Sequence, residues 1–179
     1  MSKKVLVLSA SPRKGGNSEM LCDQFMLGAE EAGNEVEKIF LRDKKINYCV
    51  ACNFCLENEG SCSQKDDMTE VMEKMIKADV IVMATPVYYY TMSAQIKALI
   101  DRTVAGHKWL NNKEFYYILS AADPNNDEMK ATLDGFRGFT RCLEEPIEKG
   151  VIYGTGAFHK GEIEGKESMK QAYEMGKTI

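Results

Sequence analysis

Four cysteines lie close together in the first half of the chain, at Cys49, Cys52, Cys55 and Cys62. Four thiolates can hold a [4Fe–4S] cluster or a zinc ion. The first three are separated by two residues each, which is closer to a ferredoxin pattern than to the paired knuckles of zinc sites. Six residues separate the fourth cysteine from the third, and no proline follows it, so the ferredoxin run is not reproduced. We favour a [4Fe–4S] cluster here, with zinc and free or redox-active thiols as open alternatives.

A second group of chemically suited residues lies between the apolar run 5–8 and a helix-like segment that begins near Met20. A loop between a strand and a helix faces free backbone N–H groups, which attract an anion. Six side chains in this loop are polar or cationic: Ser9, Ser11, Arg13, Lys14, Asn17 and Ser18. Neither the Walker pattern nor the dinucleotide glycine pattern is present. Such a loop suits a terminal phosphate monoester, as in FMN, and a merely solvated turn is the alternative.

Composition and charge limit the class of protein. The chain has 179 residues, 44% of them hydrophobic, and a net charge of −4. This predicts a single domain spanning residues 1–179 and argues against a nucleic-acid surface. No apolar run approaches the ~20 residues of a membrane helix, and Met1–Lys4 leads into a strand without a signal peptide. We therefore expect a cytoplasmic protein without a membrane partner, with cysteines reduced or bound to metal.

Strand-like and helix-like segments alternate five times, which predicts an α/β fold with a doubly wound parallel sheet. Apolar or β-prone runs indicate strands at 5–8, 36–41, 80–84, 115–121 and 151–153. Helical periodicity indicates helices at 18–32, 127–144 and 168–177, with two more around residues 71–76 and 96–103. Asp67 and Glu70 resemble a capping box for the helix around 71–76. The stretch 46–65 has no periodicity and is interpreted as a cysteine-rich loop insertion.

Three loops should meet at the C-terminal edge of such a sheet, where ligands of these folds bind. They are residues 9–18, 86–90 and 121–125. Pro86 is expected to end the strand at 80–84. The three tyrosines at positions 88–90 could pack against an aromatic ring, or only against one another.

The motifs together resemble a known family, the flavodoxin-fold NADPH-dependent FMN reductases. The residues that carry the resemblance are Ser9–Ser18, Pro86-Val87-Tyr88, Lys97 with Asp101-Arg102, and Ala172-Tyr173 with Gly176-Lys177. The cysteine spacing is similar to that of the iron–sulfur flavoproteins within this family. The resemblance implies five strands in the order 2-1-3-4-5 and an FMN phosphate held by residues 9–18. It also implies a flavin ring lined by Pro86, Val87, Tyr88, Tyr89, Ala122 and Asp123, and a homodimer or homotetramer.

We therefore expect an FMN-dependent oxidoreductase or electron-transfer flavoprotein with a [4Fe–4S] cluster. A cluster-free NAD(P)H-dependent FMN or quinone reductase is the first alternative, and a non-catalytic, zinc-stabilised module binding another phosphate ligand is the second. The flavin would do the redox chemistry, so no catalytic acid or base is assigned. Its electrons would come from NAD(P)H or a ferredoxin-type donor and pass to a protein or small molecule. We interpret His107 and His159 as surface residues and Lys97–Asp101 as an ion pair.

Overall fold

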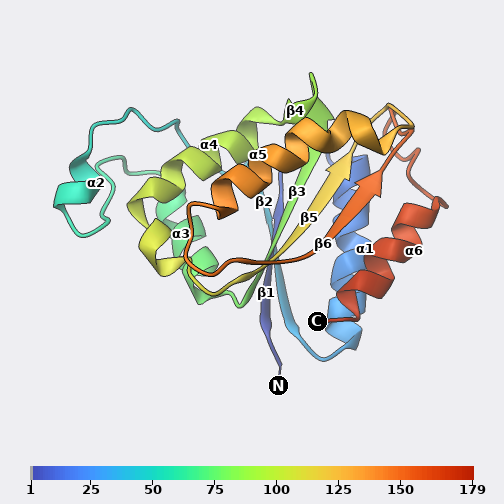
Figure 1. Cartoon of the computed structure of the whole chain (residues 1–179), viewed down its shortest axis with the longest axis horizontal. Coiled ribbons are helices and arrows are strands. Elements are labelled where there is room, and N and C mark those ends of the chain that lie inside the picture. The colour runs from blue at the N-terminus through green and yellow to red at the C-terminus, as the bar shows by residue number, and fades with distance from the viewer. Residues whose placement is uncertain (1) are drawn as a thin grey trace.

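The computed structural model describes residues 2–179 and has a parallel sheet at its centre. Five strands lie in the order β2-β1-β3-β5-β6, which confirms the predicted order, and a short sixth strand, β4, pairs antiparallel with β3. Their bounds are β1 (Lys4–Ser9), β2 (Glu35–Phe40), β3 (Val80–Tyr88), β4 (Thr91–Met92), β5 (Glu114–Ser120) and β6 (Ile147–Gly154). The fold is flavodoxin-like, and it places the ends of β1, β3, β5 and β6 along one edge (Figure 1).

Helices cover both faces of the sheet (Figure 1). One face carries α1 (Asn17–Glu31) and α6 (Glu167–Gly176), and the other carries α3 (Met68–Lys77), α4 (Ala94–Arg102) and α5 (Lys130–Thr140). Successive strand residues point to opposite faces, so Val5 and Val7 join the core under α1 while Leu6 and Leu8 join the core under α3 and α4. Shorter helical pieces are α2 (Phe54–Glu57) and the 3₁₀ turns Leu41–Asp43, Thr103–Ala105, His107–Trp109 and Asn126–Met129.

The helices α1 and α6 pack in very close contact because glycines face each other across the interface. A Cβ atom on Gly28 would lie 2.1 Å from the carbonyl oxygen of Tyr173. A Cβ atom on Gly176 would lie 2.0 Å from the carbonyl oxygen of Phe25. Both positions therefore require glycine for the observed separation of the two backbones.

The strand β3 continues through Pro86, so the prediction that Pro86 ends this strand was wrong. Pro86 pairs in register with Ser120 of β5. The neighbouring strand β1 ends at Ser9, and its last contact to β3 is from Ala10 N to Ala84 O, 2.9 Å. Alternate residues of a strand face the same neighbour, so the missing N–H of Pro86 faces the side where β1 has already ended.

A tight hairpin follows Pro86. Val87 pairs with Met92 and Tyr88 with Thr91, which leaves Tyr89 and Tyr90 as the two turn residues. Both have positive φ, 49° and 63°, as a two-residue hairpin turn requires. Most residues with a Cβ atom are strained at positive φ, and glycine and asparagine adopt this backbone conformation more easily than tyrosine does.

The last predicted helix before β6 is shorter than expected. The prediction of a helix over 127–144 was wrong at both ends, since Asn126–Met129 forms a 3₁₀ turn and α5 stops at Thr140. At the end of this region Glu145 has φ 49° and precedes Pro146, and neither conformation continues a helix. The following strand β6 starts at Ile147 and is longer than the predicted 151–153.

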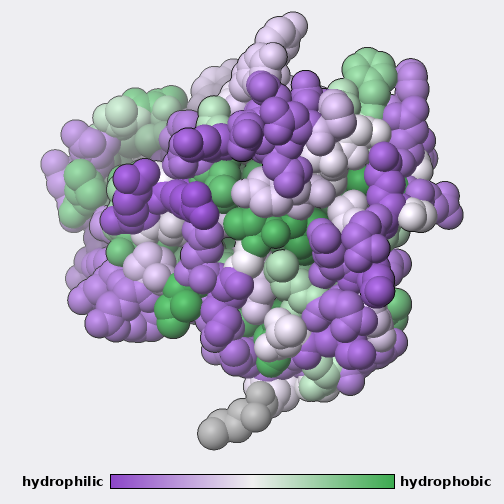
Figure 2. All heavy atoms as spheres, turned by 45° about the vertical axis from the view of Figure 1, so that its right-hand side comes forward, coloured by the Kyte–Doolittle hydropathy of each residue, from purple (hydrophilic) through white to green (hydrophobic). Residues whose placement is uncertain are grey.

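Figure 2 shows a face on which hydrophilic side chains surround a patch of hydrophobic ones near the middle.

Both histidines, His107 and His159, are exposed, and Lys97 is paired with Asp101 at 2.6 Å, as predicted. In the part of the chain that the structure describes, no helix has both the length and the apolar character needed to cross a membrane.

Candidate functional site

A pocket lies at the C-terminal edge of the sheet, where the segments after β1, β3, β5 and β6 meet. Eight of the twelve residues predicted to bind the cofactor line it: Ser11, Arg13, Asn17, Ser18, Pro86, Val87, Tyr88 and Ala122. The order of the strands explains this convergence, because parallel strands end at the same edge. The structure thus brings together the three loops that the sequence singled out.

The other four predicted residues lie outside this lining. Ser9 is fully buried at the end of β1, and its Oγ has no hydrogen-bond partner among the described residues. Lys14 is exposed at the tip of the loop, and Tyr89 is 99% exposed at the hairpin turn. Asp123 is exposed, and its Oδ1 accepts a hydrogen bond from Asn125 N at 2.8 Å.

The lining also contains residues that sequence reasoning missed. These are Gly16, Ser120, Ala121, Ala157 and Phe158. The last two follow β6, where the nearby glycines Gly154 and Gly156 are typical of a turn and indicate no contact with a ligand. Ala157 and Phe158 reach the pocket because Ala157 N donates to Ala121 O at 3.0 Å and Arg13 Nη1 donates to Phe158 O at 2.8 Å.

The loop before α1 forms a narrow cradle. Gly15 has φ 65°, and a Cβ atom on Gly16 would lie 2.4 Å from Ser11 Oγ. Ser18 is 1% exposed and its Oγ has no hydrogen-bond partner among the described residues, although Ser18 lines the pocket. Buried hydroxyls are nearly always bonded, so Ser18 indicates that a polar group belongs in the cradle.

A carboxylate fixes the loop from behind. Glu19 Oε2 accepts hydrogen bonds from Gly15 N at 3.1 Å and from Arg42 Nη1 at 2.5 Å. The Arg42 guanidinium lies over the Phe40 ring, 4.3 Å from its centroid. These contacts hold the loop against β2 without using the side chains of Arg13 and Ser11, which line the pocket. Ser11 Oγ donates to Arg13 O at 3.0 Å, and one nitrogen of the Arg13 guanidinium is bonded to Phe158 O.

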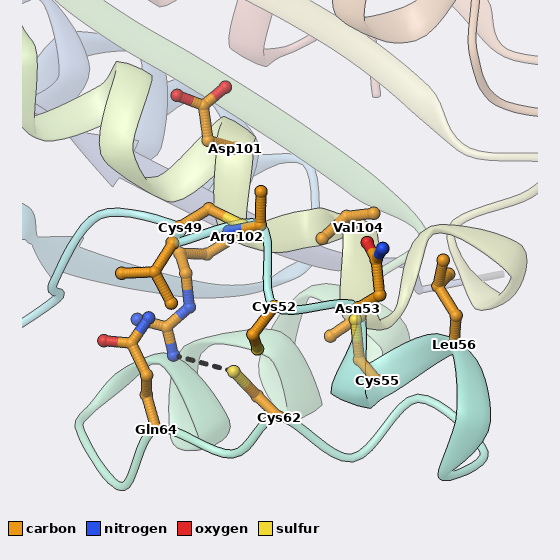
Figure 3. Close-up of a pocket in the computed structure, with 13 residues that line it drawn as sticks. Cys49, Cys52, Asn53, Cys55, Leu56, Cys62, Gln64, Asp101, Arg102 and Val104 are labelled. Carbon is orange, nitrogen blue, oxygen red and sulfur yellow. Dashed lines mark hydrogen bonds between the residues drawn. The ribbon is translucent and has the colours of Figure 1, made fainter.

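The four clustered cysteines line a second pocket, of about 320 Å³, on the loop that projects from the body of the molecule (Figures 1 and 3). Its other walls are largely apolar: Val50, Ala51, Leu56, Val104 and Ala105. Each of three sulfurs has a hydrogen-bonding neighbour: Ala51 N lies 3.4 Å from Cys49 Sγ, Ser63 Oγ 3.4 Å from Cys52 Sγ, and Arg102 Nη2 3.5 Å from Cys62 Sγ. The contact with Ser63 lowers the pKa of the Cys52 thiol.

Within residues 2–179, no three histidine, cysteine or carboxylate side chains meet closely enough to hold one metal ion. A cubane cluster uses a different iron for each thiolate, so its ligands surround a larger volume than a zinc site does. The buried Nε of Arg102, which lines the pocket, has no hydrogen-bond partner among these residues. A cation with an unused donor beside four thiols fits an anionic sulfur-rich group.

The remaining two cysteines lie elsewhere. Cys22, on α1, is fully buried in the core, and burial raises the pKa of its thiol. Cys142 is exposed beyond the end of α5. Neither contributes to the pocket of the four clustered cysteines.

Comparison with known proteins decides the family. The family model of the NADPH-dependent FMN reductases matches residues 3–134. The chain belongs to the NADPH-dependent FMN reductase family. As a member of this family, the chain is an FMN-dependent oxidoreductase.

Two curated relatives and one solved structure show what the chain is similar to. An iron–sulfur flavoprotein of Archaeoglobus fulgidus is 35% identical over 178 residues, 98% of this chain and 78% of that protein. An iron–sulfur flavoprotein of Methanocaldococcus jannaschii is 44% identical over 100 residues, and the match spans about half of each protein, 56% of this chain and 51% of that one. The solved FMN-dependent NADH-azoreductase of Bacillus anthracis, in complex with FMN, shares the fold with a TM-score of 0.76 and 14% identity, covering 99% of both chains.

Proposed function

We propose that this FMN-dependent oxidoreductase is an iron–sulfur flavoprotein, with FMN in the pocket at the strand ends and a [4Fe–4S] cluster on Cys49, Cys52, Cys55 and Cys62. The observation that carries the proposal is the gathering of all four thiols around one largely apolar pocket beside a buried arginine. The iron–sulfur flavoproteins among the relatives support the same reading.

The FMN phosphate would lie in the cradle before α1. Ser11, Ser18 and Arg13 supply hydroxyl and guanidinium donors there, and the first turn of α1 supplies free N–H groups. The flavin ring would lie against Pro86–Tyr88 and Ala122, with Phe158 on the side of β6. Bound FMN supplies the redox chemistry, and the chain's own residues bind it, orient it and limit its contact with water.

A cluster at the four cysteines would carry single electrons, whereas zinc would only stabilise the loop. The membership in an oxidoreductase family argues for the redox role. The spread of the thiols also favours a group larger than a single ion, since no three of them meet around one point within residues 2–179.

Electron donors and acceptors must approach two separate places. The flavin pocket and the cysteine pocket share no lining residue. NAD(P)H is the donor that the family name suggests, and a redox protein or small molecule would be the partner at the cysteine loop. We further propose a homodimer or homotetramer, because exposed Tyr48, Val50 and Leu56 on this loop would be covered by a neighbouring subunit.

Anaerobic purification followed by iron, sulfide, zinc and flavin analysis tests the proposal. We expect about four iron and four sulfide per cluster-loaded chain, as the composition of [4Fe–4S] requires. The variant Cys52→Ala should lose iron and keep FMN. The matched control Cys142→Ala, on an exposed cysteine away from the pocket, should keep both. Stoichiometric zinc without sulfide in the wild type would contradict the cluster.

A cluster-free NAD(P)H-dependent FMN or quinone reductase is the second candidate. It is favoured by the matching family model, that of the NADPH-dependent FMN reductases, whose description names a flavin and NADPH. Protein that binds FMN and oxidises NAD(P)H but contains neither iron nor zinc would establish this candidate instead.

A further inference from the structure

Arg102, the last residue of α4, forms a buried ion pair with Asp66. Its Nη1 lies 2.7 Å from Asp66 Oδ2 and its Nη2 lies 2.9 Å from Asp66 Oδ1, a two-pronged arrangement. The side chains of Arg102 and Asp66 are 2% and 0% exposed. Removing two charges from water is costly, so a chain keeps such a pair where the geometry serves a purpose beyond stability.

The pair holds both ends of the cysteine loop. Arg102 Nη1 donates to Asn47 O at 2.8 Å, and Asp66 accepts from Asn47 N at 3.0 Å and from Met68 N at 3.2 Å. Asn47 precedes the first cysteine of the group by two residues, and Asp66 follows the last by four. The segment that enters the loop and the segment that leaves it are thus fixed to the end of one helix.

Between these two ends the loop contributes little rigidity of its own. Its one helix, α2, has four residues, none of them buried. Ala51, Asn53 and Glu59 have positive φ. The anchor at Arg102 fixes both ends of the loop, and its middle has a second contact, where a Cβ atom on Gly60 would lie 2.3 Å from Ala105 O. The positions of the four sulfurs therefore depend in part on the anchor at Arg102.

Arg102 also contacts the thiol group directly. Its Nη2 is 3.5 Å from Cys62 Sγ, the hydrogen bond drawn in Figure 3. The Nε of the same guanidinium is buried without a partner among the described residues, so a second donor remains beside the pocket. A buried cation next to thiolates favours added negative charge more strongly than an exposed one, because water does not screen it.

We propose that Arg102 is a positioning residue for the iron–sulfur cluster, which sets the geometry of the cysteine loop through Asp66 and raises the reduction potential through its hydrogen bond to Cys62. The inference rests on the proposed cluster at the four cysteines. Hydrogen bonds to sulfur are among the features that set cluster potentials, and a donor stabilises the more negative, reduced state. Retention of the cluster and its reduction potential would thereby depend on Arg102, a residue outside the cysteine motif.

The variant Arg102→Lys tests the inference, because lysine keeps the charge but cannot bond Asp66 with two prongs and reach Cys62 as well. In anaerobically reconstituted protein, we expect roughly 10- to 100-fold weaker retention of iron against a chelator. The cluster that remains should have a more negative midpoint potential, measured by an EPR-monitored titration. FMN content should equal that of the wild type, and hydrogen exchange over residues 46–65 should be faster in the cluster-free variant.

The matched control is Arg137→Lys, the same substitution in an exposed two-pronged pair with Glu148. It should leave iron, potential and exchange unchanged. A second variant, Arg102→Met with Asp66→Leu, removes the pair while filling its space, since buried ion pairs can be replaced by apolar side chains without loss of folding. It should fold, bind FMN and lose iron.

The outcomes distinguish a failure of the proposed cluster from a failure of the role proposed for Arg102. If the wild type takes up no iron and sulfide, the proposed cluster and the role of Arg102 both fail. If the wild type loads its cluster and both Arg102 variants match it in iron retention and potential, only the role of Arg102 is overturned. Weaker retention with an unchanged potential in Arg102→Lys would overturn the hydrogen bond to Cys62.

Discussion

The side chain of Asn17 is bonded to the backbone of Gly161, with Oδ1 accepting from Gly161 N at 3.0 Å across 144 residues of sequence. Its Nδ2 donates to Ala157 O at 3.0 Å and to His159 O at 2.9 Å. The amide is thus fully engaged with the segment after β6. Asn17 contributes to the flavin pocket by holding Ala157 and Phe158 in place, rather than by offering a free donor to phosphate.

The substitution Asn17→Ala should therefore act mainly on stability. It removes the hydrogen bonds to the segment after β6 and leaves backbone groups unpaired, at a cost of about 3 kcal/mol in the free energy of unfolding. Denaturant unfolding of the FMN-free protein measures this loss. The control Asn34→Ala, which removes contacts to Lys3 and Ala29 away from the pocket, should destabilise the fold without lowering FMN affinity. Because Asn17 holds Ala157 and Phe158 at the pocket, Asn17→Ala should also lower FMN affinity. Equal FMN affinity in the Asn17→Ala and Asn34→Ala proteins would contradict this role of Asn17.

Substitution of Ser18 should have a different effect, with little change in stability and weaker FMN binding. Because Ser18 Oγ has no hydrogen-bond partner within residues 2–179, Ser18→Ala should leave the free energy of unfolding unchanged or slightly higher. If the hydroxyl bonds the FMN phosphate, FMN should bind about 10-fold more weakly, equivalent to about 1.4 kcal/mol. Fluorescence titration with FMN measures the change. The control Ser168→Ala removes another unpartnered buried hydroxyl, outside the pocket lining, and should not alter FMN binding.

The glycine contact between α1 and α6 predicts a steric effect. Gly28→Ala places a methyl group against the carbonyl oxygen of Tyr173 and should lower the free energy of unfolding by about 2 kcal/mol or more. Gly138→Ala, in α5, meets nothing within 4 Å and should be neutral or stabilising by up to about 1 kcal/mol. Thermal unfolding of the two variants side by side checks the difference, and a Gly28→Ala protein as stable as the wild type would refute it.

The tyrosine turn predicts a stabilising substitution. Replacing Tyr89 and Tyr90 by Asn and Gly supplies the residues that a two-residue hairpin with positive φ favours. The free energy of unfolding should rise by about 1–2 kcal/mol, measured by chemical denaturation. The variant Asn112→Gly provides a comparison at another left-handed position, where the smaller strain of asparagine predicts a smaller gain. A loss of stability in the hairpin variant would show that the tyrosine side chains contribute contacts worth more than the strain.

Much of this fold follows from local sequence signals. The apolar runs 5–8 and 80–84 are buried from both sides, and such runs predict parallel strands without ambiguity. The wrong predictions concern residues whose local structure is decided by contacts with distant segments. Pro86 remains in β3 only because β1 has already ended beside it. Asp67 heads α3, but its carboxylate bonds Lys45 N at 2.6 Å instead of forming the predicted capping box.

The sequence predicted those residues of the candidate site that meet because parallel strands end at the same edge of the sheet. Residues of the first loop and of Pro86–Tyr88 line one pocket because the sheet order brings their strands together. Phe158 was not predictable, since its position depends on contacts with Arg13 and Asn17 that span more than 140 residues. Arg102 carried a weak signal as part of a helix motif, and only the folded chain shows it beside Cys62.

The base of the cysteine loop has one more consequence. Lys45 N donates to Asp67 Oδ2 and Asp67 N donates to Lys45 O at 3.1 Å, so the chain leaves and re-enters the sheet domain at adjacent points. The segment between them could be exchanged for a brief connector, provided that Arg102, which would lose Asp66, is replaced by an apolar residue as well. The proposed cluster loop could in this sense be gained or lost as a module, and grafting it onto a related scaffold would require matching this junction and the arginine that pairs with Asp66.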